Sequence, residues 1–299
     1  MIKALNVTKT FDDFKALDNM SLNVEKGSVY GLVGPNGAGK TTIIKVLCGI
    51  YRPDSGTITI DGKEVYENTK TKERIIYISD ELFFYASYSI KAVAKLYSKL
   101  YPDFSWERYE NLKKVFKIDE KRKIRKLSKG MQKQVAFWLG ICAQPEVMIL
   151  DEPVDGLDPV MKRNVWSLLL SDVAQRGTTV LISSHNLREL EDVCDHVGIM
   201  YNGKVVLQKA LDDVKGNIHK IQLAFSDKFP DALGEKLEIL HKSEFGSITT
   251  LICKGSHEDI RSEIDRFKPV ISDILPLTLE EVFIYELGGM GYEFENILL

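Results

Sequence analysis

Cysteine is scarce in this chain, and the residues present lack the spacing of a metal site or a redox motif. Four are scattered over 299 residues, at Cys48, Cys142, Cys194 and Cys253. A chain of this length buries a full hydrophobic core without disulfide or metal staples. We therefore expect the cysteines to be small buried hydrophobic side chains in a reducing compartment.

Long apolar segments are missing as well. No window approaches the roughly 18 uninterrupted apolar residues of a membrane-spanning helix. The first residues, MIKALNVTKTF, contain no apolar region ahead of a small-residue cleavage site, so no signal peptide is predicted. These features predict a cytoplasmic protein whose action at any membrane would depend on a partner.

Neither sign of charge dominates the composition. The chain has 40 Lys and Arg against 43 Asp and Glu, which leaves a formal net charge of -3. This balance excludes a general nucleic-acid binder, although it permits a local basic patch. The content of 44% hydrophobic and 28% charged residues is typical of globular proteins and excludes a disordered or fibrous one.

The order of predicted elements favours an α/β fold. The first 30 residues are predicted to form short strands, and Asp61-Gly62 marks the turn of a hairpin. Residues 86–143 have a helical pattern. Apolar runs at Val147–Leu150 and Thr179–Ser183 are typical of buried parallel strands, and helix-like sequence follows each of them. This alternation predicts a largely parallel sheet with an antiparallel β element before it.

A small second domain is expected after residues 212–217, a polar stretch that is predicted to be a linker. Strands and two short helices follow over residues 218–275 in the order βαββαβ, which is the ferredoxin-like arrangement. Thr278 and Glu281 then have the spacing of a capping box at the start of a last helix. We therefore predict domains at 1–212 and 218–299, the second a small α+β accessory domain.

A complete phosphate-loop motif follows the apolar strand at Val29–Val33. Residues 34–41, GPNGAGKT, match the pattern GxxxxGK[ST]. In such a loop, backbone N–H groups and a helix N-terminus point at a phosphate chain. Lys40 is expected to reach the β- and γ-phosphates of a nucleotide, and the Thr41 hydroxyl to bind Mg²⁺. The residues assigned to nucleotide binding here are Gly34, Pro35, Asn36, Gly37, Ala38, Gly39, Lys40, Thr41 and Thr42.

Two carboxylates follow the buried strand that ends at Leu150. Asp151 is predicted to hold Mg²⁺ through water, and Glu152 to polarise the attacking water as a general base. By itself this pair fits a solvated strand end equally well, but the phosphate loop upstream makes it the expected second half of an NTP site. His185 follows the next buried strand and is a candidate hydrogen-bond partner of the γ-phosphate, although a lone histidine there is more often structural.

Together these motifs resemble those of the ABC-type ATPases. Residues 127–132, LSKGMQ, are similar to the LSGGQ signature of that family. Gly156-Leu157-Asp158 resembles its D-loop, Ser183–His185 its switch-histidine segment, and Phe11 the aromatic residue that stacks on adenine. The resemblance covers about residues 1–212. It implies ATP and Mg²⁺ as ligands and a RecA-like phosphate-loop core with antiparallel β and helical subdomains, the helical one at about 86–143.

Members of that family sandwich two ATP molecules head to tail between two nucleotide-binding domains. The resemblance therefore implies a second such domain, either a copy of this chain or a paralogue. The signature of one domain faces the phosphate loop of the other, so Ser128 and the helix N-terminus after it would point at the partner's γ-phosphate. The nucleotide contacts implied in this way are Ser128, Lys129, Gly130, Met131 and Asp158.

Three residues depart from the family pattern. Asp80 stands where the family usually has Gln; we assign it to catalysis and to Mg²⁺ contact, with a charge that Gln lacks. Lys129 replaces a signature Gly, which fits either a phosphate partner or a solvated loop charge. Met131 replaces the Gln that would complete a capping box with Ser128.

The SKGM variant and the segment TLEEVF at 278–283 resemble the ABC-2 branch, whose ATPase subunits mostly drive export. YPDFSW at 101–106 resembles a bacterial group related to peptides and antibiotics. These likenesses imply a membrane-spanning permease subunit and a location on the inner face of the cell membrane. The alternative is a soluble ABC ATPase that acts on nucleic acid or the ribosome. Such proteins commonly carry two nucleotide domains or a long inserted coiled coil, and the sequence contains neither, so no nucleic-acid partner is expected.

Two further stretches allow more than one interpretation. The aromatic residues Phe83, Phe84, Tyr85 and Tyr88 lie where relatives receive a coupling helix from the membrane subunit, but they fit core packing of the helical subdomain comparably well.

Residues 113–133 contain ten Lys or Arg. That run fits a solvated face, contact with anionic lipid headgroups, or contact with nucleic acid.

Overall fold

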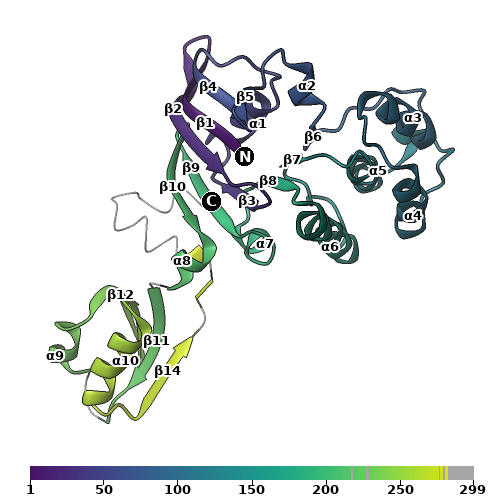
Figure 1. The fold of residues 1–299 in the computed structure, drawn as a ribbon. Coiled ribbons are helices and arrows are strands. Elements are labelled where there is room, and N and C mark those ends of the chain that lie inside the picture. Colours follow the sequence, from purple (N-terminus) through teal and green to yellow (C-terminus); the bar gives the residue numbers. More distant parts are fainter. Residues whose placement is uncertain (217, 227–228, 276, 279, 282–299) are drawn as a thin grey trace. The chain divides into compact units, whose positions relative to one another are not determined.

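The computed structural model describes residues 1–299 except 217, 227–228, 276, 279 and 282–299 (Figure 1). Two compact units make up the chain. The first contains Met1–Asn186 and Val193–Gln208, and the second contains Leu187–Asp192 and the chain from Lys209 onward.

The first unit begins with an antiparallel sheet in the strand order β2-β1-β4-β5. Strand β1 (Ile2–Phe11) pairs with β2 (Phe14–Val24) on one side and with β4 (Ser55–Ile60) on the other. Strand β4 turns into β5 (Lys63–Glu64) through Asp61 and Gly62, whose φ angles of 49° and 74° suit a tight hairpin turn. The predicted hairpin is confirmed.

A second, six-stranded sheet has the order β10-β9-β3-β8-β7-β6. Strands β3, β8, β7, β6 and β9 run parallel to one another. Every residue of β3, β7 and β8 is buried, which explains their nearly continuous apolar sequences. The strands of this sheet are β3 (Val29–Val33), β6 (Ile75–Ile78), β7 (Val147–Asp151), β8 (Thr179–Ser184), β9 (His196–Tyr201) and β10 (Lys204–Ala210).

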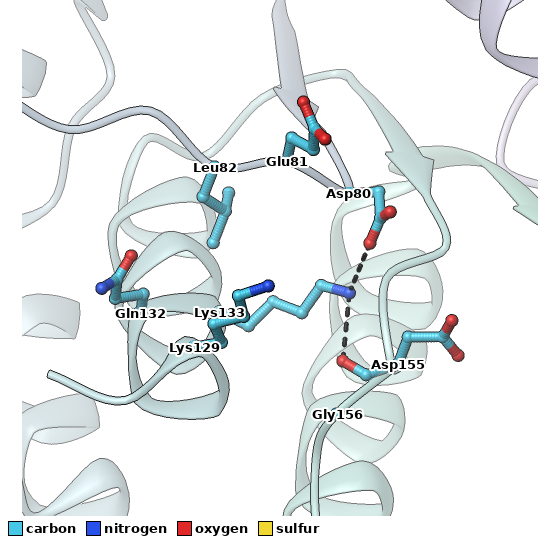
Figure 2. A pocket seen from close by; sticks show the side chains of 8 residues that line it. All are labelled: Asp80, Glu81, Leu82, Lys129, Gln132, Lys133, Asp155 and Gly156. Carbon is cyan, nitrogen blue, oxygen red and sulfur yellow. Dashed lines mark hydrogen bonds and ion pairs between the residues drawn. The ribbon is translucent and has the colours of Figure 1, made fainter.

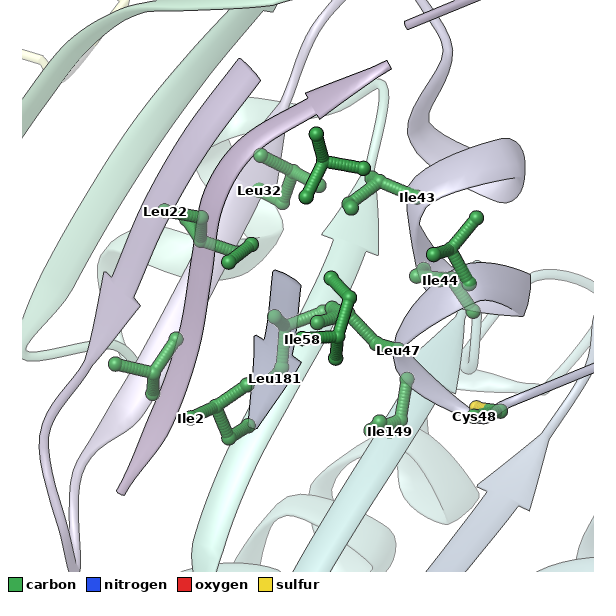
Figure 3. Packing of buried hydrophobic residues seen from close by; sticks show 14 of the residues in the cluster. Ile2, Leu22, Leu32, Ile43, Ile44, Leu47, Cys48, Ile58, Ile149 and Leu181 are labelled. Carbon is green, nitrogen blue, oxygen red and sulfur yellow. The ribbon is translucent and has the colours of Figure 1, made fainter. Parts of the chain in front are cut away.

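The main core fills the space between the two sheets and helix α1 (Lys40–Leu47) (Figure 3). Ile43, Ile44 and Leu47 of α1 meet apolar side chains of both sheets, including Ile58 and Ile149. This packing anchors the helix that follows the phosphate loop, so the loop is held at both of its ends.

Helices dominate the middle of the first unit. They are α2 (Thr69–Lys72), α3 (Ile90–Leu100), α4 (Trp106–Phe116), the 3-10 turn η1 (Ile124–Lys126), α5 (Lys129–Cys142) and α6 (Pro159–Arg176). Ser89, Ser105 and Ser128 cap α3, α4 and α5, because each hydroxyl accepts the backbone N–H three residues on. Trp138 of α5 stacks on Tyr109 of α4 with ring centroids 4.7 Å apart. The helical pattern predicted for 86–143 is confirmed.

The second unit contains a four-stranded antiparallel sheet in the order β12-β13-β11-β14. With its helices it follows the predicted βαββαβ order. The short helix after β11 ends at Gly234. The elements are α7 (Leu187–Glu191), α8 (Leu211–Gly216), β11 (Ile218–Ala224), α9 (Asp231–Gly234), β12 (Glu238–Phe245), β13 (Ile248–Lys254), α10 (His257–Arg266) and β14 (Ile271–Leu275).

The polar stretch at 212–217 corrects one prediction. It was expected to be a linker, but α8 occupies Leu211–Gly216. Leu211 is buried at the start of this helix, and Asp212 and Asp213 lie in its first turn, where the helix dipole favours negative charge. Burial of Leu211 against the fold and the acidic first turn both favour the helix over an extended linker.

Three smaller predictions can also be compared with the structure. Thr278 and Glu281 form a reciprocal capping box, because each backbone N–H donates to the other side chain, at 3.1 and 3.2 Å. The rest of the predicted last helix lies outside the described residues. All four cysteines are buried and free. In the part of the chain that the structure describes, no helix has the length and apolar character to span a membrane.

Candidate nucleotide site

The phosphate loop connects the buried end of β3 to the first turn of α1. Gly39 immediately precedes the helix with φ of 103°. A Cβ atom there would lie 2.7 Å from the carbonyl oxygen of Ala16, so the position requires glycine. No side chain of the described residues caps α1. Its first backbone N–H groups are therefore left to an anionic ligand, as the motif predicts.

Lys40 is buried inside its own loop. Its ammonium donates hydrogen bonds to the carbonyl oxygens of Gly34 at 2.5 Å and Pro35 at 3.2 Å, and lies 4.0 Å from a carboxylate oxygen of Glu152. Burial lowers the pKa of Lys40, and the nearby charges of Glu152 and Asp151 act in the opposite direction. The cation is thus already placed where a phosphate would neutralise it.

A cavity of about 330 Å³ opens beside the loop. Thr41, Asp80 and Asp151, the three predicted metal ligands, all line it, and so does Glu152. Its other lining residues are Phe14, Ala16, Pro35, Asn36, Gly37, Gly39, Lys40 and Thr42. Gly34 and Ala38 of the predicted set belong to the loop but do not line the cavity.

Glu152 adopts a left-handed backbone conformation with φ of 45°, which is unusual for a non-glycine residue. Its N–H donates to the Ser183 carbonyl and hydroxyl oxygens, both at 3.2 Å. Ser183 also donates its hydroxyl to Asp151 at 2.5 Å. Strand β8 therefore orients the carboxylate of Asp151, the last residue of β7, and the backbone of Glu152 after it.

The Glu152 carboxylate meets His185, whose Nδ1 lies 3.0 Å from Oε2. Burial raises the pKa of Glu152, while His185 and Lys40 oppose the rise. A carboxylate with a raised pKa, held by a histidine beside a phosphate loop, has the properties of a general base.

The signature residues lie at the start of α5. Ser128 accepts the N–H of Met131 at 3.3 Å, and Lys129 is exposed. A Cβ at Gly130 would lie 2.7 Å from the carbonyl oxygen of Gly156, so the signature helix packs directly on the D-loop backbone. Asp158 caps α6 by accepting the N–H groups of Val160 and Met161, both at 3.0 Å.

Phe11, the residue predicted to stack on adenine, lies next to a second aromatic residue, Phe14, to which the sequence analysis assigned no role. Phe11 packs edge-to-face on Tyr51 with ring centroids 5.3 Å apart. Phe14, rather than Phe11, lines the cavity itself. Because β1 and β2 are joined by a turn at which Phe11 and Phe14 pair, both rings belong to the same hairpin end.

Known proteins match both the sequence and the fold. Residues 17–155 match the ABC transporter family. The chain is 36% identical to the ABC transporter ATP-binding protein YtrB of Bacillus subtilis (strain 168), over 97% of this chain and 99% of that protein. It is 33% identical to the bacitracin transport ATP-binding protein BcrA of Bacillus licheniformis, over 97% and 98%. The chain belongs to the ABC transporter ATP-binding proteins.

A solved structure of an ATP-binding subunit of an ABC transporter has the same fold, with a TM-score of 0.67 and 26% identity over 72% of this chain and 92% of that one. The predicted fold class and the predicted ATPase family are thereby confirmed. As a member of this family, the chain binds ATP.

The oxygen donors of the cavity also fit Mg²⁺. The hydroxyl of Thr41 and the carboxylates of Asp80 and Asp151 are the hard ligands that this ion prefers. A second group, Glu152, Asp155 and His185, brings its ligand atoms within 4.8 Å of one another. Because that group contains an imidazole, it matches the oxygen preference of Mg²⁺ less well than the first group does.

Removing the loop cation tests the phosphate-binding assignment. Lys40→Ala should weaken ATP binding by about 10- to 100-fold, since a charge-assisted hydrogen bond contributes about 1.5–3 kcal/mol. Hydrolysis should be lost with it. Titration calorimetry with ATP measures the affinity, and Lys63→Ala, an exposed lysine on β5, is the control. Normal binding and turnover in Lys40→Ala would contradict the assignment.

The raised pKa of Glu152 predicts a pH dependence. A base must be ionised, so kcat/KM should fall as the pH decreases through the pKa of Glu152, which lies above the ordinary value of 4.5. For stability the sign is opposite: the contribution of a raised carboxyl pKa is fully present below the unfolded value and is lost as the pH rises through the folded one. Activity should therefore disappear while circular dichroism still reports a folded chain. An acid limb at or below 4.5, or one that coincides with unfolding, refutes the prediction.

Proposed function

We propose that this chain is the ATP-hydrolysing subunit of an exporter, that it dimerises around ATP, and that it powers transport through a separate membrane-spanning permease. The observation that carries the proposal is the incomplete cavity. Lys40, Glu152 and Asp151 line it, but among the lining residues in the described chain none comes from the signature at 127–131. A second nucleotide-binding domain, either a copy or a paralogue, would supply that missing side.

The side chains divide the reaction between them. Lys40 and the N–H groups of the loop bind the phosphates, and α1 directs its positive end at them. Mg²⁺, when bound, neutralises phosphate charge, with Thr41, Asp151 and Asp80 as its proposed ligands. Glu152 accepts a proton from the attacking water. His185 orients the Glu152 carboxylate through its hydrogen bond and stabilises the charge of that carboxylate as the proton is transferred.

The partner domain would contribute its own Ser128, Lys129, Gly130 and Met131 to the γ-phosphate. Ser128 caps α5, so the N-terminus of that helix is fixed in a geometry suited to an anion. Asp158 would stand at the same interface from the D-loop, and Phe11, with Phe14 beside it, would stack on adenine. Closure on ATP and reopening after hydrolysis would then drive the permease.

The exposed aromatic residues support docking on a permease. Phe83 is 82% exposed, Tyr85 57% and Tyr88 39%, and the three rings contact one another in sequence. Exposed rings at these positions are available to a partner, and only Phe84 of the stretch is half-buried. The similarity to BcrA, a bacitracin transport ATP-binding protein, supports peptide antibiotics as the cargo class. The proposed permease would hold this chain at the inner face of the cell membrane.

Changing the base tests the composite site. Glu152→Gln should lower kcat by about 10²- to 10⁴-fold, the usual contribution of a general base. Because the amide keeps the shape of the side chain, ATP should still bind and should convert the chain to a dimer, which light scattering after size exclusion measures. Free turnover, or a chain that stays monomeric with ATP, would refute this part of the proposal.

Co-purification tests the transporter assignment. The tagged chain is recovered from gently solubilised cells, with Phe83→Ser/Tyr85→Ser as the matched variant that removes two exposed rings. A polytopic membrane protein should co-purify with the unmodified chain and be depleted with the variant. Recovery of ribosomes or nucleic acid would instead establish the soluble alternative and direct attention to the basic residues at 113–133.

A further inference from the structure

Lys133 is a buried cation on the second turn of α5, in the helix that begins with the signature. Only 5% of the residue is exposed. Figure 2 shows its side chain reaching toward Asp80 and the backbone at Asp155, and all three residues line a pocket of about 520 Å³. None of the sequence motifs indicated a role for it.

Three oxygen atoms surround the Lys133 ammonium. It donates to the carbonyl oxygen of Glu152 at 2.6 Å, to the carbonyl oxygen of Asp155 at 3.0 Å, and to Oδ1 of Asp80 at 3.2 Å. An ammonium has three protons, so this set satisfies its full donor capacity. The side chain thereby ties α5 to two other segments, at Asp80 and at residues 152–155.

The contact to Glu152 explains how that residue keeps its left-handed backbone. Conformations of this kind cost about 1–3 kcal/mol and persist where the surroundings hold them. The N–H of Glu152 is held by Ser183 from β8, and its carbonyl is held by Lys133 from α5. Both peptide groups that flank the candidate base are therefore fixed by hydrogen bonds from other elements.

The same helix touches the same segment at a second point. Gly130 packs on the carbonyl of Gly156 so closely that a Cβ would lie 2.7 Å from it. Lys133 and Gly130 are three residues apart and thus lie on one face of α5. This face is docked on residues 152–156, between the base and the D-loop.

The third contact is with Asp80, one of the three residues that depart from the family pattern. Asp80 brings a negative charge to a buried cation, which the usual Gln would not do. Its side chain is 55% exposed while that of Lys133 is 6% exposed. Solvent screens the pair from one side, so we attribute its effect mainly to orientation of the ammonium rather than to Coulomb attraction. Asp80 and Lys133 are best understood as a matched pair.

We propose that Lys133 is a positioning residue for ATP hydrolysis: it holds the backbone of Glu152 and ties the signature helix and Asp80 to the base. Movement of α5 is then transmitted to Glu152 within the same chain. The inference rests on the proposed role of Glu152 as the base. It differs from that role in predicting an effect on turnover from a residue that does not touch the nucleotide.

The test compares variants of the full chain. Lys133→Met keeps the length of the side chain and removes its donors. Misplacement of a catalytic group costs up to about 100-fold in rate, so we expect kcat to fall by about 10- to 100-fold with KM for ATP changed by less than about threefold. Lys113→Met, which removes a lysine paired with Glu120 in the helical subdomain, is the control and should hydrolyse normally.

A double-mutant cycle separates positioning from general destabilisation. Lys133→Met combined with Glu152→Gln should lower kcat no further than Glu152→Gln alone, because Lys133 acts through the position of the Glu152 carboxylate. Additive losses would overturn the proposal. So would a normal kcat in Lys133→Met, or a loss of activity that follows the loss of thermal stability.

Two further measurements keep the outcomes distinct. If Lys133→Met does not fold, Lys133→Gln retains a shorter neutral donor and should still show reduced kcat with unchanged KM; normal turnover in it overturns the proposal. Glu152→Gln is assayed alongside. Free turnover in Glu152→Gln refutes the assignment of the base, whereas an inactive Glu152→Gln with a fully active Lys133→Met refutes the positioning role alone.

Discussion

The parallel register of β3, β8 and β7 is the constraint on which the site depends. Val33 pairs with Ser184, and Ser183 pairs with Asp151, so three strands end together at one edge of the sheet. Parallel strands direct their carboxyl ends the same way, and ligands bind in that region of open α/β sheets. Residues that are distant in sequence become neighbours there because their strands are hydrogen-bonded in this register.

Burial at this edge sets the electrostatics. Lys40 and Glu152 lie in a place where both charges are partly removed from water, which lowers the pKa of the lysine and raises that of the carboxyl group. The two groups partly compensate each other at 4.0 Å. Such a site suits the proposed reaction, in which the negative charge of a triphosphate would offset the lysine and the carboxylate would accept a proton from water.

The helical subdomain contributes through α5 rather than through the cavity. Stacking of Trp138 on Tyr109 anchors the far end of that helix, while Gly130 and Lys133 dock its near end on the segment after β7. Signature, D-loop and base are therefore adjacent in a single chain. In the proposed dimer, the phosphate contacts made by the signature would be coupled to the opposite chain's base by the same rigid packing.

The sequence by itself determined the local features. The phosphate loop, the buried strands and the order of elements follow from spacing and periodicity, which act over a few residues, and the motifs among them also identified the family. Tertiary structure decided what depends on distant partners: the left-handed backbone of Glu152, the ring that lines the cavity beside Phe11, and the helix at Leu211–Gly216. The role of Lys133 belongs to the same class, since a lysine in a basic run has no local signal of burial. Only the fold brings the carbonyls of Glu152 and Asp155 to its ammonium. The donor and the acceptors lie on different segments, so the sequence of either segment alone does not predict these hydrogen bonds.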